Sequence, residues 1–472
     1  MKPNFKIDKR FWLNFLALFL LIFLMCSIRW TYNNFYRVNF DEIGIVLSSG
    51  LGIGTDREIL MSFIKKVVLR SLLYSSLIAI FLQTIHKRSM TIVTYGAVFA
   101  LLVYRISISN VEFGSFFNFE KSDFYETEFV NPKTTKIEWP KRRNVVFIAL
   151  ESIEKLYGTT EISGEVLTPK ITKLEKENVS FENYHSISGL SHTIAAITGF
   201  VTGLPLFFTS YKGMDKMTGA IGIGSIFKNA GYQTWSIFPA TGKFSLKSKF
   251  MADKGFDNII DGELIRKSLA NPPKEKPFHG VDDGTLFEYS KPIIQNIIKT
   301  KQPYFIFMET VNTHCKGFFT EYCEKLGFKQ ETMEDITKCD DTIIYNFVQW
   351  MQQADPSAAI ILINDHKQHV GVLMDQLEKI ENRPLANVFI NTKIFNKTDK
   401  NRPVSAMDFF PTIIEVAGGK IDGCKLGLGV SLSDRCKNIK TLRERFPGQE
   451  LEILLEKKND LYYYLATGKQ RK

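Results

Sequence analysis

The sequence has few cysteines and none of the spacings that mark small redox or zinc-binding proteins. It contains six cysteines in 472 residues, and no two of them form a Cys-x-x-Cys pair. That pair is typical of zinc ribbons and thioredoxin-like sites, so neither kind of site is supported. Internal repeats and low-complexity segments are absent too. What remains is an ordinary globular composition, with 44% hydrophobic and 23% charged residues, in a chain long enough for two domains.

A basic stripe interleaved with aromatic residues, the usual sign of a nucleic-acid surface, is also missing. The 60 lysines and arginines are scattered along the chain and exceed the 50 aspartates and glutamates, for a net charge of +10. Such an excess is typical of a surface near anionic lipid, or of a lysine-rich proteome. The composition therefore disfavours a nucleic-acid partner.

Apolar residues are concentrated near the N-terminus, in three runs that cover about 11–28, 67–85 and 89–107. The first run is long enough to cross a bilayer as a helix, whereas the third is short for a span. Basic residues precede the first run, and no small-residue cleavage site follows it. Trp30 and Tyr32 follow instead, as at a membrane interface. We therefore expect an uncleaved first helix whose N-terminus lies in the cytoplasm.

The number of crossings decides on which side of the membrane the rest of the chain lies. Basic residues at 86–88 suit a short cytoplasmic hairpin, whereas Lys65, Lys66 and Arg70 argue weakly for the opposite orientation. Three crossings place everything after about residue 110 outside the cytoplasm, whereas two crossings would place it in the cytoplasm. With three, we expect a multi-pass protein of a bacterial inner membrane with its main domain in the periplasm.

The cysteines give a second indication of compartment. Cys26 lies in the first apolar run, and the other five fall late in the chain. Cys323 and Cys339 bracket one short segment, and Cys424 and Cys436 bracket another. Pairs that close short loops fit disulfides in an oxidising periplasm, although five unrelated thiols are the alternative. Cys315 would be left without a partner.

We divide the chain into a membrane region at 1–110, a polar and aromatic linker at 111–142, and a folded domain at 143–472. In this domain, buried strands are predicted at 144–150, 234–237, 304–308, 358–363 and 388–390. Helices are predicted between them, at 169–177, 193–202, 224–230, 287–298 and 340–353. This alternation predicts an α/β fold with a mainly parallel central sheet and flanking helices.

Two of the predicted strands end in residues that bind metals. Glu151 follows the first strand, and Asp365 and His366 follow the strand that ends near Asn364. The carboxyl ends of parallel strands meet at one edge of the sheet, so these groups can converge on one divalent cation. Each strand end alone is a weak signal, because apolar strands often end in polar residues. A strand that ends in an Asp-His pair is rarer than a strand that ends in a single acidic residue.

Two further segments carry candidate site residues. Thr193 follows Gly189 and opens a helix of small and apolar residues, where its hydroxyl lies at the positive end of the helix dipole. A cation bound beside such a hydroxyl would lower its pKa and make it a nucleophile, although Thr193 could also be a simple helix cap. His314 lies five residues beyond Glu309, after the strand at 304–308. It is a candidate hydrogen-bond donor to a phosphate group, or a candidate metal ligand.

These segments together resemble the phosphoglycerol transferase and lipoteichoic acid synthase branch of the alkaline phosphatase–sulfatase superfamily. The matching segments are 144–152, 188–204, 310–314 and 364–366. The run Gly-Leu-Ser-His-Thr-Ile-Ala-Ala-Ile-Thr-Gly within them is most similar to periplasmic glucan phosphoglycerol transferases. The resemblance covers nearly the whole chain, and the combination is specific although no single piece is.

The resemblance implies roles for individual residues. Glu151, Thr193, Asp365 and His366 match the metal site, with Thr193 as the nucleophile. His314 matches the histidine that contacts the phosphate group, and Lys247 falls where relatives have a basic residue in the substrate pocket. One divalent metal ion is implied; we expect manganese, with magnesium or zinc as alternatives.

The sequence also departs from the family. Lys367 and Gln368 follow the Asp-His pair where a small or acidic residue is common, and Cys315 follows His314 where glycine or proline is usual. These changes put the transferred group and the acceptor in doubt. The sulfatase signature, Cys or Ser in a Cys/Ser-x-Pro-x-Arg run, is missing, which disfavours hydrolysis of sulfate esters.

The predicted function is a membrane-anchored phosphoglycerol transferase. It would take its group from phosphatidylglycerol, form a phospho-threonine and pass the group to a periplasmic or cell-envelope glycan. The alternatives are a phosphoethanolamine transferase acting on lipopolysaccharide and a metal-dependent phosphodiesterase. A membrane-tethered binding protein with an inactive site is disfavoured, because all four metal-site residues are present.

Overall fold

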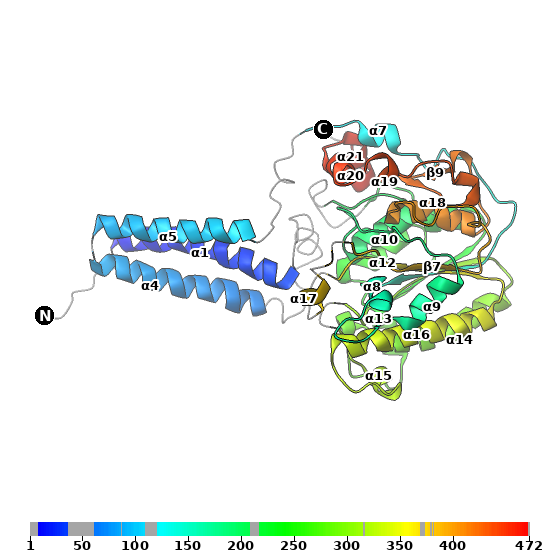
Figure 1. Cartoon of the computed structure of the whole chain (residues 1–472), viewed down its shortest axis with the longest axis horizontal. Coiled ribbons are helices and arrows are strands. Elements are labelled where there is room, and N and C mark those ends of the chain that lie inside the picture. Colours follow the sequence, from blue (N-terminus) through cyan, green and yellow to red (C-terminus); the bar gives the residue numbers. More distant parts are fainter. Residues whose placement is uncertain are drawn as a thin grey trace. The chain divides into compact units, whose positions relative to one another are not determined.

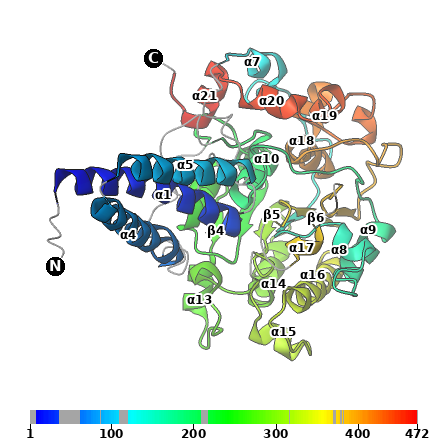
Figure 2. The same ribbon diagram turned by 60° about the vertical axis from the view of Figure 1, so that its left-hand side comes forward.

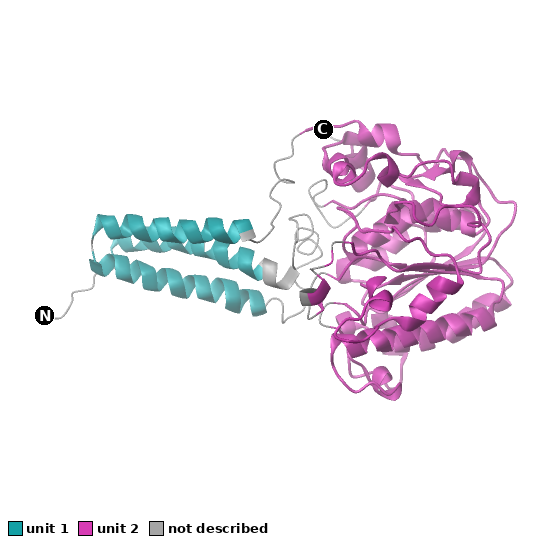
Figure 3. Ribbon diagram, viewed as in Figure 1, with its two compact units in different colours: residues 1–43, 55–117 teal, residues 44–54, 118–472 magenta. Residues whose placement is uncertain are grey.

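The computed structural model describes residues 8–35, 61–85, 87–108, 120–207, 217–314, 317–368, 373–377, 380 and 382–470. The chain divides into two compact units, one of residues 1–43 and 55–117, the other of residues 44–54 and 118–472 (Figure 3).

The described part of the first unit contains a bundle of three helices, α1 (Lys9–Phe35), α4 (Arg70–Ile85) and α5 (Arg88–Ile108), which pack side by side (Figure 1). A π-helix, η1 (Ile64–Leu69), leads directly into α4. Leu18, Ile22, Leu82 and Val98 form the buried core of the bundle. Most other apolar side chains point outward, as in helices that lie in lipid.

The three apolar helices expected from the sequence are confirmed. Three stretches, Lys9–Trp30, Met61–Ile85 and Arg88–Ser107, are long and apolar enough to cross a membrane. The first two helices extend beyond the predicted 11–28 and 67–85, because helical hydrogen bonding continues through residues that are not apolar. Lys65 and Lys66, for example, belong to η1. Long basic side chains at helix ends reach toward the membrane surface and do not end the helix.

The second unit is built on a six-stranded sheet with the order β4-β3-β5-β2-β6-β7. Its strands are β2 (Val145–Leu150), β3 (Gln233–Ile237), β4 (Asn258–Ile260), β5 (Tyr304–Glu309), β6 (Ala359–Asn364) and β7 (Asn387–Ile390). The pairs are parallel except that β7 runs antiparallel to β6. β2 lies between β5 and β6, so the carboxyl ends of these three strands are neighbours.

Helices cover both faces of this sheet (Figure 1, and turned by 60° in Figure 2). On one face lie α10 (Thr193–Thr202), α11 (Ile223–Asn229) and α18 (Ala406–Val416), which share a hydrophobic core with Phe147 of β2 and Phe307 of β5. On the other lie α9 (Pro169–Glu177), α14 (Asp283–Lys299) and α16 (Met333–Ala354). The predicted α/β fold class is thus confirmed. β4 and α18 were not predicted from the sequence.

Residues 120–142 of the predicted linker contain two short elements of the second unit, and residues 111–119 lie outside the described residues. α7 (Phe124–Glu128) buries Phe124 and Tyr125, whose hydroxyl donates to the carbonyl of Leu455 at 3.0 Å. β1 (Ile137–Glu138) pairs antiparallel with β8 (Lys420–Ile421). Both disulfides considered from the sequence are present, Cys323–Cys339 and Cys424–Cys436. Cys315 lies outside the described residues.

Candidate functional site

Three metal-ligand side chains converge at the carboxyl edge of the sheet. Glu151 follows β2, and Asp365 and His366 follow β6; all three are buried. One ligand atom from each lies within 4.8 Å of the others. His366 Nε2 is 3.5 Å from Glu151 Oε1 and 3.4 Å from Asp365 Oδ2. The parallel pairing of β2 with β6, which sets Leu150 opposite Asn364, brings them together.

Ser152 connects these groups and was not predicted as a site residue. Its backbone is left-handed, with φ of 51°, so the chain turns sharply after Glu151. Its N–H donates to Asp365 Oδ1 at 3.0 Å, and its hydroxyl donates to Glu151 Oε1 at 2.7 Å. A serine beside a candidate ligand was the only sequence signal for this role.

Thr193 lies beside this group. It is the first residue of α10, after His192 in an extended conformation. Its hydroxyl donates to Glu151 Oε2 at 3.2 Å and lies 3.2 Å from His366 Nε2. The turn before α10 contains Gly189 with φ of 75°, where a Cβ would come within 2.7 Å of the Phe207 ring. The structure therefore brings Glu151, Thr193, Asp365 and His366 together.

The pKa values of the two carboxylates in this group are shifted in opposite directions. Burial and the charge of Glu151 raise the pKa of Asp365 to about 7. Burial also acts to raise the pKa of Glu151, but the charges of His366 and His314 and two hydrogen bonds outweigh it and hold this pKa below its ordinary value. Two carboxylates this close favour one shared proton or one cation between them.

The donor set fits a divalent cation. Asp365 Oδ2 is buried and accepts no hydrogen bond from the described residues, and His366 Nε2 lies 3.4 Å from it. A buried carboxylate oxygen that accepts no hydrogen bond is costly, and a cation would satisfy it. Carboxylates with one imidazole are ligands for manganese, magnesium or zinc. Glu151, Asp365 and His366 would hold the ion, with the Thr193 hydroxyl beside them.

His314 belongs to the loop after β5, which is fastened to Glu151 at two points. The N–H of Glu151 donates to Thr310 Oγ1 at 2.8 Å, and the hydroxyl of Thr313 donates to the carbonyl of Glu151. The His314 ring packs edge-on against Phe278, with centroids 4.7 Å apart. The charge of His314 also acts to lower the pKa of Glu151.

Lys247 is the first residue of α12 (Lys247–Asp253) and is almost fully buried. Its ammonium forms an ion pair with Glu309, the last residue of β5, and lies 5.2 Å from the centre of the Phe238 ring. The sequence pointed to Lys247 but not to Glu309. An acidic residue at the end of an apolar strand, the signal that singled out Glu151, was available for it as well.

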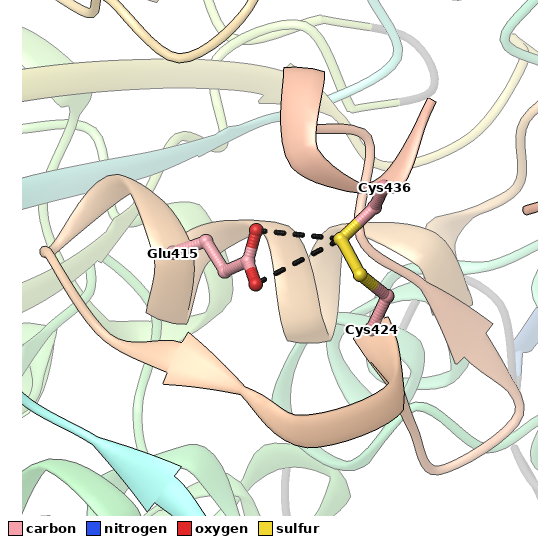
Figure 4. Close-up of side chains that lie close together, drawn as sticks. All are labelled: Glu415, Cys424 and Cys436. Carbon is pink, nitrogen blue, oxygen red and sulfur yellow. Dashed lines mark hydrogen bonds between the residues drawn. A yellow bond between two sulfur atoms is a disulfide. The ribbon is translucent and has the colours of Figure 1, made fainter. Parts of the chain in front are cut away.

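A second group of possible ligands is not a metal site. Glu415, Cys424 and Cys436 lie close together, with Glu415 Oε2 at 3.7 Å from the sulfur of Cys436 (Figure 4). The sulfurs of Cys424 and Cys436 are joined in a disulfide, so neither cysteine can act as a thiolate ligand. Glu415 instead pairs with Arg435.

Comparison with known proteins agrees with this geometry. The Sulfatase family matches residues 143–419, more than half of the chain. The chain belongs to this family. Phosphoglycerol transferase I of Escherichia coli O6:K15:H31 (strain 536 / UPEC) is 26% identical over 302 residues, 61% of this chain and 38% of that protein. Its counterpart from Shigella flexneri is 27% identical over the same shares. The chain thus matches well under half the length of these curated relatives, and the predicted resemblance is confirmed.

Two solved structures share the fold. The lipooligosaccharide phosphoethanolamine transferase A of Neisseria meningitidis, an integral membrane protein, has a TM-score of 0.52 and 12% identity, over 86% of this chain and 84% of that one. An alkaline phosphatase superfamily protein from Vibrio parahaemolyticus has a TM-score of 0.50 and 20% identity, over 62% of this chain and 72% of that one. At such identities the likeness concerns the fold alone.

Proposed function

We propose that this protein is a metal-dependent transferase of the Sulfatase family that moves a phosphoglycerol group from a phospholipid to a cell-envelope glycan. The observation that carries the proposal is the position of the Thr193 hydroxyl, 3.2 Å from both Glu151 Oε2 and His366 Nε2. This hydroxyl lies beside a buried group suited to one divalent cation. The relatives named phosphoglycerol transferase I support the choice of transferred group.

In the first half-reaction, Thr193 Oγ1 attacks the phosphorus of the lipid headgroup. The bond from Oγ1 to phosphorus forms, the bond from phosphorus to the diacylglycerol oxygen breaks, and a phospho-threonine ester remains. Glu151 Oε2 receives the hydroxyl proton, since it lies within hydrogen-bond reach of Thr193 Oγ1, whereas His366 Nε2 would be occupied by the ion. The departing diacylglycerol oxygen takes a proton from water, and Glu151 releases its proton to water before the second half-reaction. A bound cation would supply charge stabilisation and lower the pKa of the attacking hydroxyl.

In the second half-reaction, a hydroxyl of the acceptor glycan attacks the phosphorus and the bond to Thr193 breaks. Glu151 takes the proton of the acceptor hydroxyl and passes it to the departing Thr193 oxygen. His314 and Lys247 are the cationic groups that we assign to the phosphoryl oxygens. Lys247 has three N–H donors, so its pairing with Glu309 leaves donors for a phosphate. Two successive displacements give ping-pong kinetics.

The apolar helices α1, α4 and α5 fit an enzyme whose donor and released product are both lipids. We place the protein in a bacterial inner membrane with its second unit in the periplasm. Two observations support this location: the basic N-terminus before α1, and the two disulfides, which form in oxidising compartments.

The decisive experiment incubates the full-length protein with phospholipids that carry labelled headgroups, with and without manganese. Mass spectrometry of the peptide that contains Thr193 should find a phosphoglycerol adduct when phosphatidylglycerol is the donor. A phosphoethanolamine adduct from phosphatidylethanolamine would replace our choice of group with the alternative. Release of free glycerol phosphate at the same rate with and without glycan would indicate a phosphodiesterase. No adduct from either lipid would refute the proposal.

A further inference from the structure

The membrane-helix unit contains a cavity of about 190 Å³ lined by four basic side chains. The four come from all three helical segments of the unit: Arg29, Lys66, Arg70 and Arg105. Trp30 and Tyr74 also line the cavity. Arg29 lies near the end of α1, Lys66 in η1 and Arg105 near the end of α5, so the cavity lies at the end of the bundle where α1 and α5 finish.

These cations have no acidic partner among the residues that the structure describes. The described helices of this unit, residues 9–35, 61–85 and 88–108, contain no aspartate or glutamate. Asp8 is the one acidic residue among the unit's described residues, and its carboxylate accepts from the N–H of Phe11 at the beginning of α1. None of the four cations forms an ion pair with a residue that the structure describes. Four like charges around one cavity repel each other unless an anion occupies it.

Arg70 lies within a helical stretch that is long and apolar enough to cross a membrane, Met61–Ile85. Charged residues in such helices are rare and usually mark functional sites. Lys66 lies in η1, and π-helical turns are rare and often found at functional sites.

Membrane orientation cannot explain the basic residues at both ends of the bundle. Lys9, Arg10, Lys87 and Arg88 lie at the opposite end, where α1 and α5 begin. The excess of lysine and arginine that orients membrane proteins concerns the cytoplasmic side only. Whichever way the bundle is inserted, one of its two basic ends therefore has another cause.

We propose that this cavity binds the headgroup of a phospholipid with net negative charge. One guanidinium group can donate two parallel hydrogen bonds to two oxygens of a phosphate. Three of the four cations are arginines. Trp30 and Tyr74 are of the aromatic types that lie at headgroup level. The volume of about 190 Å³ is well above what a single water molecule needs, so the cavity can take a larger group. The occupant is a bilayer lipid, because α1, α4 and α5 are membrane helices.

The same charges select among headgroups. Phosphatidylglycerol carries a net negative charge, whereas the ammonium of phosphatidylethanolamine would meet four cations and no carboxylate among the described lining residues. The cavity thus favours phosphatidylglycerol. That the bound lipid is also the donor rests on the proposed function; the binding itself does not.

The test measures lipid retention by the purified full-length protein. The protein, in mixed micelles with equal amounts of phosphatidylglycerol and phosphatidylethanolamine, is examined by native mass spectrometry. Wild type should retain phosphatidylglycerol at least tenfold over phosphatidylethanolamine. Arg70→Gln combined with Arg105→Gln should lower this retention at least tenfold. The matched control, Lys87→Gln with Arg88→Gln, removes two charges from the other end of the bundle. It should leave the retention of phosphatidylglycerol unchanged.

Three results would overturn the inference: equal retention of the two lipids, equal loss in the control, or displacement of phosphatidylglycerol by an equal concentration of free glycerol phosphate. The last would show that the cavity takes soluble anions. If the double variant does not fold, Arg105→Gln alone must still lower retention at least threefold. Thr193→Ala should retain phosphatidylglycerol like wild type. Loss of the transfer reaction with intact lipid selectivity therefore counts against the proposed function only.

Discussion

Lys247 and Glu309 form an ion pair that is almost completely buried beside the candidate site, with side chains 3% and 5% exposed. Glu309 ends β5 and Lys247 begins α12, so the pair joins the sheet to that helix. The second carboxylate oxygen of Glu309 has no hydrogen-bond partner in the described part of the chain. Burial raises the pKa of Glu309, and Lys247 opposes this rise. The charge of each residue is therefore tolerated because of the other.

Removing one member of this pair should destabilise the protein strongly. Lys247→Met or Glu309→Gln alone leaves an uncompensated buried group, which costs about 3–5 kcal/mol. The double variant Lys247→Met with Glu309→Leu should cost much less than the sum of the single changes. Chemical unfolding of the full-length protein, followed by fluorescence, measures the free energies. Additive losses would contradict the pairing.

Replacing the proposed nucleophile should stop transfer without unfolding the protein. Thr193→Ala should lower the transfer rate at least a thousandfold and leave the thermal midpoint and metal content near wild type. Thr193→Ser keeps a hydroxyl and should retain measurable transfer. The matched control is Thr198→Ala in the same helix, whose hydroxyl donates to the carbonyl of Ile194 at 2.7 Å. It should lose about 1 kcal/mol of stability and keep its activity. Substantial turnover by Thr193→Ala would exclude its role.

Replacing a candidate ligand should remove the metal. Glu151→Gln or Asp365→Asn takes one anionic oxygen from the group, and both activity and bound manganese should be lost. Elemental analysis of the purified protein measures the metal. Asp408→Asn is the control, because Asp408 is a buried carboxylate that caps α18 and belongs to neither candidate group. Full metal content in the Glu151 or Asp365 variant would show that the ligand set is wrong.

His185 should make stability depend on pH. Burial, with the nearby charges of Arg443 and Lys367, lowers the pKa of His185 to about 4, from 6.5 when unfolded. Between these values the unfolded chain binds more protons than the folded one, so stability should rise as pH rises from 4 to 6.5. Allowing for partial exposure, the gain is roughly 1–2 kcal/mol. Comparing unfolding of wild type and His185→Gln across this range isolates the effect. Parallel curves would contradict it.

Much of this protein follows from local patterns in its sequence. Continuous apolar runs predicted β2, β5 and β6, because strands covered on both faces need apolar residues at every position. α9 and α10 begin and end at the predicted residues. α18 was missed because Pro411 lies within it and argued against a helix, although its polar residues Asp408, Thr412 and Glu415 recur at helical spacing. β4 is too short and too exposed to give an alternating signal.

The sequence by itself determined the strand-end residues Glu151, Asp365 and His366 and the threonine that opens α10, because side-chain type and position along an element are local properties. Only the tertiary structure decided that Ser152 connects two candidate ligands, that Glu309 neutralises Lys247, and that four cations from three helical segments surround one cavity. Each of these depends on a distance between residues far apart in the chain. Strand order and helix packing set such distances, and no local pattern encodes them.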